Sequence, residues 1–157
     1  MSQMLVRDLM TTDLFTLNAD HHFGSAGELL AFKHVRHLPV VRKGKLIGLV
    51  TQRDLMRAQA RLMLELVKAD PEGSDERVVT VYVKDFMTKD DLVTCGPATP
   101  ADDAARLMLD RKLGCVLVTD DGELKGIITE ADIVKWAVEM MAKVRLEQAA
   151  RTRPPES

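Results

Sequence analysis

Two threonine–aspartate pairs stand at the same spacing in the chain, and their side chains are the first candidates for chemistry. Thr51-x-x-Asp54 follows the apolar run "GLV", and Thr129-x-x-Asp132 follows "GII". A hydroxyl with a carboxylate three residues later forms a capping box, in which both side chains bond to backbone amides at the start of a helix. Each pair therefore predicts a helix that begins at its threonine.

Other reactive side chains give no sign of catalysis or of a metal site. Two adjacent histidines would diverge on a helix, and His34 and His37 lie on either side of a helix end, so we expect no metal. Cys95 and Cys115 have no metal-ligand spacing and resemble small buried hydrophobes of a reducing compartment. The chain contains no phosphate loop, nucleophile elbow, CxxC or HExxH motif, so we expect no enzyme.

The threonine–aspartate pairs belong to a longer internal repeat. "LIGLVTQRDL" at 46–55 returns as "LKGIITEADI" at 124–133, an offset of 78 residues. "VRDLMT" at 6–11 matches "VKDFMT" at 83–88 with an offset of 77, so the second copy carries one extra residue. Glycine, threonine and aspartate stay in register across the whole unit, which indicates a duplication.

Each copy predicts the element order β-α-β-β-α, an α+β fold. Short strands are expected at 13–17 ("DLFTL") and 91–95 ("DLVTC"), each followed by a helix. In the second copy Thr99 is the expected N-cap and Pro100 the first helical residue. "HLPVV" is nearly all apolar and predicts a buried strand. Gly44 is expected at positive φ in the turn before the next strand.

The pattern also predicts how the chain is organised. We expect a first unit at 1–69, a linker at 70–77, a second unit at 78–150 and a disordered tail at 151–157. The last helix of each unit is long and apolar on one side, which favours a homodimer, with intramolecular packing as the alternative. A net charge of −2 and the lack of a long apolar run favour a cytoplasmic protein that binds neither nucleic acid nor membrane.

These motifs resemble a cystathionine β-synthase (CBS) domain, present twice. The resemblance covers roughly residues 4 to 140 and is carried by the "DxMT" segments, the strand pairs, Gly48-Leu49-Val50-Thr51 with Asp54, and Gly126-Ile127-Ile128-Thr129 with Asp132. It implies a tandem CBS pair, or Bateman module, with two units packed about a pseudo-twofold axis and extended last helices. It also implies a regulatory role, with an adenine nucleotide or another adenosyl compound bound in clefts between the units.

The resemblance assigns roles to particular residues. Asp54 and Asp132 would hold ribose hydroxyls, and Thr51 and Thr129 would reach toward ribose or phosphate, which suits their chemistry. Adenine would lie among apolar side chains, and the positions group them by copy: Leu14, Phe15, Val35 and Leu49 in one cleft, Leu92, Val93, Leu113 and Ile127 in the other.

The two copies differ where phosphate would bind. Arg36 and His37 occupy positions at which the similar gamma subunit of the AMP-activated kinase contacts phosphates with basic side chains. The second copy has Gly114 and Cys115 there, and Ala131 in place of Arg53. This asymmetry favours phosphates held by the first copy.

We therefore expect a sensor of AMP, ADP or ATP that acts on an unknown partner protein through a change in CBS pairing. The alternatives are S-adenosylmethionine, NAD or a cyclic dinucleotide as the ligand, or a constitutive interaction scaffold with vestigial clefts.

Overall fold

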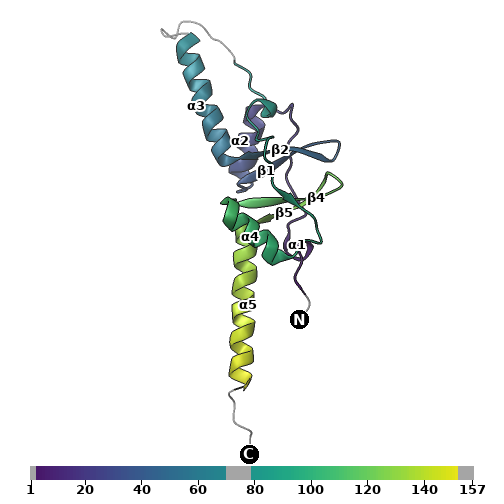
Figure 1. Cartoon of the computed structure of the whole chain (residues 1–157). Coiled ribbons are helices and arrows are strands. Elements are labelled where there is room, and N and C mark those ends of the chain that lie inside the picture. The colour runs from purple at the N-terminus through teal and green to yellow at the C-terminus, as the bar shows by residue number, and fades with distance from the viewer. Residues whose placement is uncertain (1–2, 70–78, 152–157) are drawn as a thin grey trace, which may run out of the picture.

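Two β-hairpins, one from each copy of the repeat, form the centre of the structure, a computed structural model that describes residues 3–69 and 79–151 (Figure 1). The first hairpin consists of β1 (His37–Arg42) and β2 (Lys45–Thr51), and the second of β4 (Cys115–Asp120) and β5 (Glu123–Thr129). Both pairs are antiparallel, and both contain a register shift in the first strand. The strands predicted from the two apolar runs are confirmed.

The hairpin turns explain the residues found there. Lys43 and Gly44 have φ angles of 50° and 78°, and Asp121 and Gly122 have φ angles of 48° and 76°. Two successive residues at positive φ are typical of a type I′ turn, whose twist matches that of the strands. The positive φ predicted for Gly44 is confirmed.

The two hairpins meet at their tips in a single sheet. The strand order is β1-β2-β5-β4-β3, where β3 (Thr94–Cys95) is a short parallel edge strand. Between β2 and β5 only Lys45 and Glu123 are paired. Two further backbone bonds flank them, from Leu46 N to Gly122 O at 3.1 Å and from Leu124 N to Gly44 O at 3.1 Å. The halves are thus joined at the tips and lie apart toward the other strand ends.

Helices cover each hairpin, and the last helix of each copy extends beyond it. The first half carries α2 (Phe23–Phe32) and α3 (Gln52–Ala69), and the second carries α4 (Ala101–Arg111) and α5 (Glu130–Arg151). Figure 1 shows α3 and α5 pointing in opposite directions away from the strands. The fold class expected from the sequence, two α+β CBS-like units with extended last helices, is confirmed.

The entry segment of each copy packs on the other copy's half. Val6 of α1 (Val6–Leu9) is fully buried in the core of the second half, with Val116, Val118 and Ile128. Val83 of the short 3₁₀ helix η1 (Val83–Asp85) is fully buried in the core of the first half. The packing therefore does not follow the repeat boundary that the sequence indicates. The expected linker at 70–77, and the expected tail apart from Arg151, lie outside the described residues.

Two local predictions are wrong. Residues 13–17 form no strand; Leu17 alone makes a parallel bridge, donating to Pro39 O at 2.9 Å and accepting from Val41 N at 2.9 Å. Thr99 does not cap α4, because its hydroxyl accepts a bond from Gly96 N at 3.1 Å and stabilises the preceding turn. The helix begins at Ala101 instead, with Pro100 in the N-cap position.

Candidate functional site

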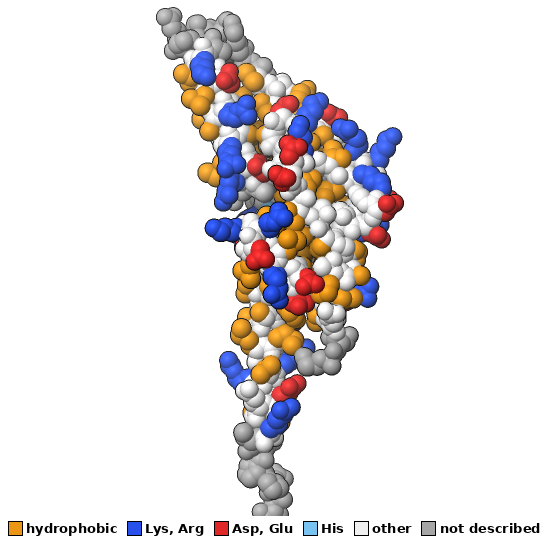
Figure 2. Space-filling view, in the orientation of Figure 1, with side chains coloured by type: hydrophobic (Ala, Val, Ile, Leu, Met, Phe, Trp, Pro, Cys, Tyr) orange, Lys and Arg blue, Asp and Glu red, His pale blue; other side chains and the backbone are white. Residues whose placement is uncertain are grey.

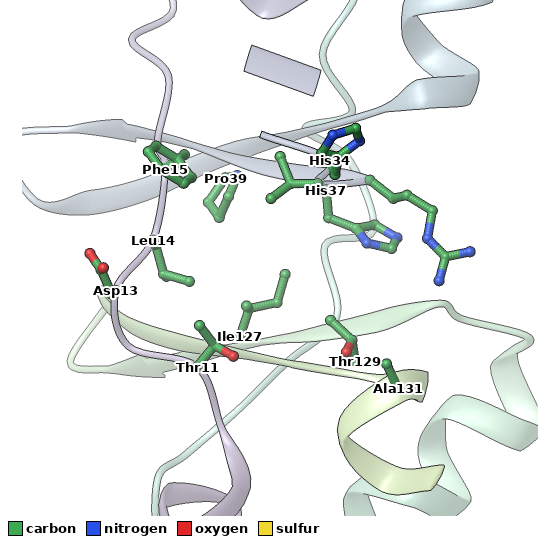
Figure 3. A pocket seen from close by; sticks show the side chains of 12 residues that line it. Thr11, Asp13, Leu14, Phe15, His34, His37, Pro39, Ile127, Thr129 and Ala131 are labelled. Carbon is green, nitrogen blue, oxygen red and sulfur yellow. The ribbon is translucent and has the colours of Figure 1, made fainter. Parts of the chain in front are cut away.

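Two neighbouring clefts lie between the halves, and each takes its walls from both copies. The larger has a volume of about 830 Å³ and is lined by Arg36, His37, Leu49, Thr51, Gln52, Arg53, Met56, Arg57, Ala60, Lys112, Leu113, Gly114, Cys115 and Glu130. The smaller has a volume of about 270 Å³ and is lined by Thr11, Asp13, Leu14, Phe15, His34, Val35, Arg36, His37, Pro39, Ile127, Thr129 and Ala131. Figure 3 shows the smaller cleft, with His37 of the first half pointing toward Thr129 of the second.

The predicted grouping of apolar residues by copy is wrong. Leu49 at the end of β2 lines the larger cleft together with Leu113, which precedes β4. The smaller cleft combines Ile127 of β5 with three first-copy residues: Leu14, Phe15 and Val35. The reason is the pseudo-twofold packing, which places the end of each hairpin's second strand opposite the start of the other hairpin's first strand.

Leu92 and Val93 line neither of these clefts. Val93 packs against the core of the second half, and its carbonyl accepts a bond from Leu117 N at 3.3 Å. Leu92 is half-buried beside it. The two copies differ here. In the second copy, residues 93–95, which include the edge strand β3, run beside β4. In the first copy, the matching segment places Leu14 and Phe15 in the smaller cleft.

Both threonine–aspartate pairs form complete capping boxes. Asp54 Oδ2 accepts bonds from Thr51 N at 2.8 Å and Thr51 Oγ1 at 2.7 Å, and Asp54 N donates to Thr51 Oγ1 at 3.2 Å. Asp132 and Thr129 repeat the arrangement at 2.8, 2.7 and 3.4 Å. In each pair the threonine lines a cleft and the aspartate stands behind it, at the start of α3 or α5. One carboxylate oxygen of each aspartate is thus engaged by its threonine.

The glycine before each pair lets the other copy's entry segment approach. A β-carbon on Gly48 would lie 2.6 Å from Met87 Sδ and 3.2 Å from Thr88 O, and one on Gly126 would lie 2.7 Å from Met10 Sδ and 2.9 Å from Thr11 O. Backbone bonds join these segments: Leu49 and Thr88 exchange bonds of 2.8 and 2.9 Å, and Thr11 and Ile127 exchange bonds of 2.9 and 3.0 Å. Thr88 Oγ1 thereby comes within 3.5 Å of Asp54 Oδ1.

Arg36 and His37 form a wall shared by both clefts. A β-carbon on Gly114 would lie 3.1 Å from His37 Nε2, so the imidazole of His37 packs against a residue that has no side chain. Burial lowers the pKa of His37 below its ordinary value, and the positive charge of Arg36 lowers it further, while the carboxylate of Glu130 raises it. His37 is therefore mainly neutral at pH 7.

Several cleft residues were not predicted from the sequence, although a comparison of matching positions in the two copies could have identified some of them. Arg57 lies one helical turn after Arg53 on α3, so both point to the same face. Lys112 occupies the C-cap of α4 with φ 53°, and His34 occupies the matching position with φ 51°. Non-glycine residues at positive φ are uncommon and often lie in functional sites. Neither was predicted as a cleft residue, because both lie outside the strand–turn–helix motif.

The structure offers no cysteine nucleophile in the larger cleft. Burial raises the pKa of the Cys115 thiol to about 12, and the nearby carboxylate of Glu130 adds to the rise. The thiol is therefore protonated at neutral pH and contributes only apolar surface. Within residues 3–69 and 79–151, no three histidine, cysteine or carboxylate side chains converge to hold a metal ion. No helix in this part of the chain is long and apolar enough to cross a membrane.

Comparison with known proteins gives a family match over most of the chain. The model of the CBS domain matches residues 6–61 and again residues 83–139. A CBS domain-containing protein from Dictyostelium discoideum is 30% identical over 146 residues, which cover 90% of this chain and 97% of that protein. Inosine-5′-monophosphate dehydrogenase from Bifidobacterium longum is 38% identical over 128 residues, but the match covers 80% of this chain and only 21% of the enzyme.

Solved structures agree in fold. CBSX2 in complex with AMP, a CBS-pair protein from Arabidopsis thaliana, is 32% identical, with a TM-score of 0.71 and coverage of 87% of this chain and 98% of that chain. The CBS domain pair of the protein MJ0100, in complex with 5′-methylthioadenosine and S-adenosyl-L-methionine, is 25% identical, with a TM-score of 0.68 and coverage of 85% and 98%.

Proposed function

Because the chain belongs to the CBS domain family and carries two copies in tandem, we propose that it is a regulatory module that binds an adenine nucleotide between its halves. The observation that carries this proposal is the larger cleft. It combines apolar side chains, a threonine hydroxyl at a helix N-terminus and four cationic side chains in about 830 Å³. This volume lies within the range of roughly 300–1,000 Å³ that is usual for small-molecule sites.

The parts of a nucleotide have matching surroundings in this cleft. Leu49, Met56 and Leu113 offer apolar surface for adenine. Thr51 can bind a ribose hydroxyl from the cleft wall. Asp54 lies directly behind it and would accept from the ribose hydroxyls in place of Thr88 Oγ1, which lies 3.5 Å from Asp54 Oδ1. The cationic side chains and the start of α3 favour phosphate. Structures of relatives that contain AMP, or 5′-methylthioadenosine and S-adenosyl-L-methionine, support an adenosyl ligand here.

The ligand would act through α3 and α5. Each helix begins directly after a cleft threonine, so a ligand that binds Thr51 or Thr129 contacts the N-terminus of a helix that extends beyond the sheet (Figure 1). A change in the tilt of the halves would move both helices. Coupling of this kind is typically worth about 1–3 kcal/mol, which modest differences in contact can supply.

We also propose that the helices form a homodimer. Exposed apolar side chains recur on both: Met56, Met63, Leu64, Leu66 and Val67 on α3, and Val134, Val138, Met141, Val144 and Leu146 on α5. Figure 2 shows hydrophobic side chains along both projecting helices. The same feature supports the second candidate function, a constitutive scaffold in which these helices bind a partner and the clefts stay empty.

A thermal-shift panel of AMP, ADP, ATP, S-adenosylmethionine and NAD separates the two functions. A ligand at about 100 times its Kd adds about 2.7 kcal/mol to the free energy of unfolding, which raises Tm by several degrees. A rise with one of these compounds supports the sensor and identifies its ligand. An unchanged Tm with all five compounds would support the second candidate function, the constitutive scaffold.

Asp54→Ala and Asp8→Ala form a matched pair for locating the site. Asp8 Oδ2 accepts a bond from Leu5 N at 2.9 Å, the same type of bond that Asp54 makes, but Leu5 lines neither cleft, whereas Asp54 holds Thr51 of the larger cleft. Both substitutions should cost about 1 kcal/mol of stability. Only Asp54→Ala should abolish the ligand-induced rise in Tm, and an undiminished rise would show that Asp54 acts as a cap alone.

A further inference from the structure

We infer that the two clefts bind different classes of adenosyl ligand. The larger takes a nucleotide with two or more phosphates, and the smaller takes an adenosyl compound without phosphate. This inference rests on the proposed function, because it concerns the same clefts. It goes further in stating that their ligands are not interchangeable.

The larger cleft has the charge for a polyphosphate. Four cationic side chains line it, Arg36, Arg53, Arg57 and Lys112, against the single carboxylate of Glu130. In the described part of the chain, none of the four cations forms an ion pair. They come from different parts of the fold: the residue before β1, two successive turns of α3 and the C-cap of α4. Arginine is suited to phosphate because its planar fork can donate two parallel bonds.

The smaller cleft lacks this charge at the matching positions. The repeat offset of 78 residues places Ala131 where the larger cleft has Arg53, and His34 where it has Lys112. Lys135 matches Arg57, yet it does not line the smaller cleft. Among the described residues that line this cleft, Arg36 is the one Lys or Arg and Asp13 the one carboxylate, and His37, whose pKa is lowered by burial, adds little charge at pH 7. A phosphate group would find almost no net attraction here.

Because the two clefts share a wall, a ligand in the larger cleft changes the charge available in the smaller one. Arg36 and His37 line both, and the contact of His37 with Gly114 lies on the side of the larger cleft. A polyphosphate in the larger cleft would engage Arg36, which is the one Lys or Arg among the described residues that line the smaller cleft. The volumes, about 830 and 270 Å³, agree with this order: only the larger has room for a phosphate chain beside a nucleoside.

Isothermal titration calorimetry of the full chain tests this, with ATP and adenosine as the probes. Arg53→Gln/Arg57→Gln removes two larger-cleft cations, and Lys135→Gln is the matched control at the position equivalent to Arg57. Phe15 is 41% exposed and lines only the smaller cleft, so Phe15→Ala probes that site with little risk to folding.

We expect one ATP per chain, and adenosine still binding once ATP is saturating. The double arginine variant should weaken ATP about tenfold or more for each arginine and leave adenosine unchanged, because a bond to a charged group contributes about 1.5–3 kcal/mol. Lys135→Gln should change neither affinity, and Phe15→Ala should weaken only adenosine.

Two ATP molecules per chain, or an equal loss of ATP affinity in Lys135→Gln and the double variant, would overturn the inference while the proposed function stands. No binding of ATP, adenosine or any other adenosyl compound would overturn both.

Discussion

Gly48 and Gly126 decide how closely the two halves interlock. Each lies on a hairpin strand at the point where the other copy's entry segment crosses it, and a side chain there would meet a methionine and a backbone carbonyl. The glycine of the repeated motif is therefore explained by close backbone approach, since neither Gly48 nor Gly126 has a positive φ. Close-packed interiors do not accommodate an added methyl group without movement.

Gly126→Ala should lower the free energy of unfolding by about 1–3 kcal/mol through overpacking. Gly48→Ala should cost less, because its closest contact is the flexible end of Met87, whereas a β-carbon on Gly126 would lie 2.9 Å from the backbone oxygen of Thr11. Urea denaturation of both variants measures the difference. Gly24→Ala is the control: its added β-carbon meets nothing within 4 Å, so it should be neutral or stabilising. Equal losses at all three positions would contradict this account.

His37 should make stability depend on pH. Burial and Arg36 hold its pKa below the ordinary value of 6.5, so the unfolded chain takes up a proton at a higher pH than the folded chain does. The stability that neutral His37 provides is complete above pH 6.5 and is lost as the pH falls toward the lowered pKa. Between pH 7.5 and 5.5 the free energy of unfolding should therefore fall more in the wild type than in His37→Gln. Equal falls in denaturant titrations would show that His37 protonates equally in both states.

At the scale of elements, α3 and α5 combine a cleft residue at one end with an apolar stripe farther along. Val134, Val138 and Met141 follow each other at helical spacing on α5, and Val138 and Met141 are 60% and 64% exposed. Met63 on α3 is 60% exposed and matches Met141 at the repeat offset. A pair of equivalent stripes suits a symmetric contact with a second copy, because such interfaces use the same patch twice.

Val138→Lys/Met141→Lys should convert the proposed dimer to a monomer, because two charges on the stripe would have to be desolvated in the interface. Sedimentation velocity of the wild type and the variant measures this. Glu139 is an exposed charged residue on the same helix, so Glu139→Lys is the control and should leave the dimer intact. A wild-type monomer, or a variant that sediments as the wild type does, would count against these helices as the interface.

Local pattern predicted the elements well, and the reason is physical. The hairpins and the long helices follow from apolar runs, turn glycines and capping boxes, which act within a few residues of the chain. The grouping of Leu49 with Leu113, and the crossing of Val6 and Val83, depend on which surfaces meet after folding. No local preference encodes that contact. Many individual cleft residues could therefore be predicted from the sequence, but not which of them line the same cleft.

For the whole molecule, the crossing segments mean that neither copy holds a complete core. The first half contains Val83 in its core and packs Phe86 and Met87 against it, all from the second copy. A fragment of residues 12–88 retains these residues and should fold better than one of residues 1–69, which ends at the repeat boundary. Circular dichroism and denaturant titration of the two fragments compare them. Equal cooperativity in both would show that residues 79–88 are dispensable for the first half.

The crossing also sets an order of events during synthesis on the ribosome. Val6 is synthesised before Ile128, with which it packs and which lies 122 residues later. At typical rates of about 5–20 residues per second, the interval between the two is about 6–24 s. The first half can close as soon as Val83 and Met87 leave the exit tunnel. A nascent chain should thus contain a folded first half while Val6 remains unpacked until the strands of the second half have been synthesised.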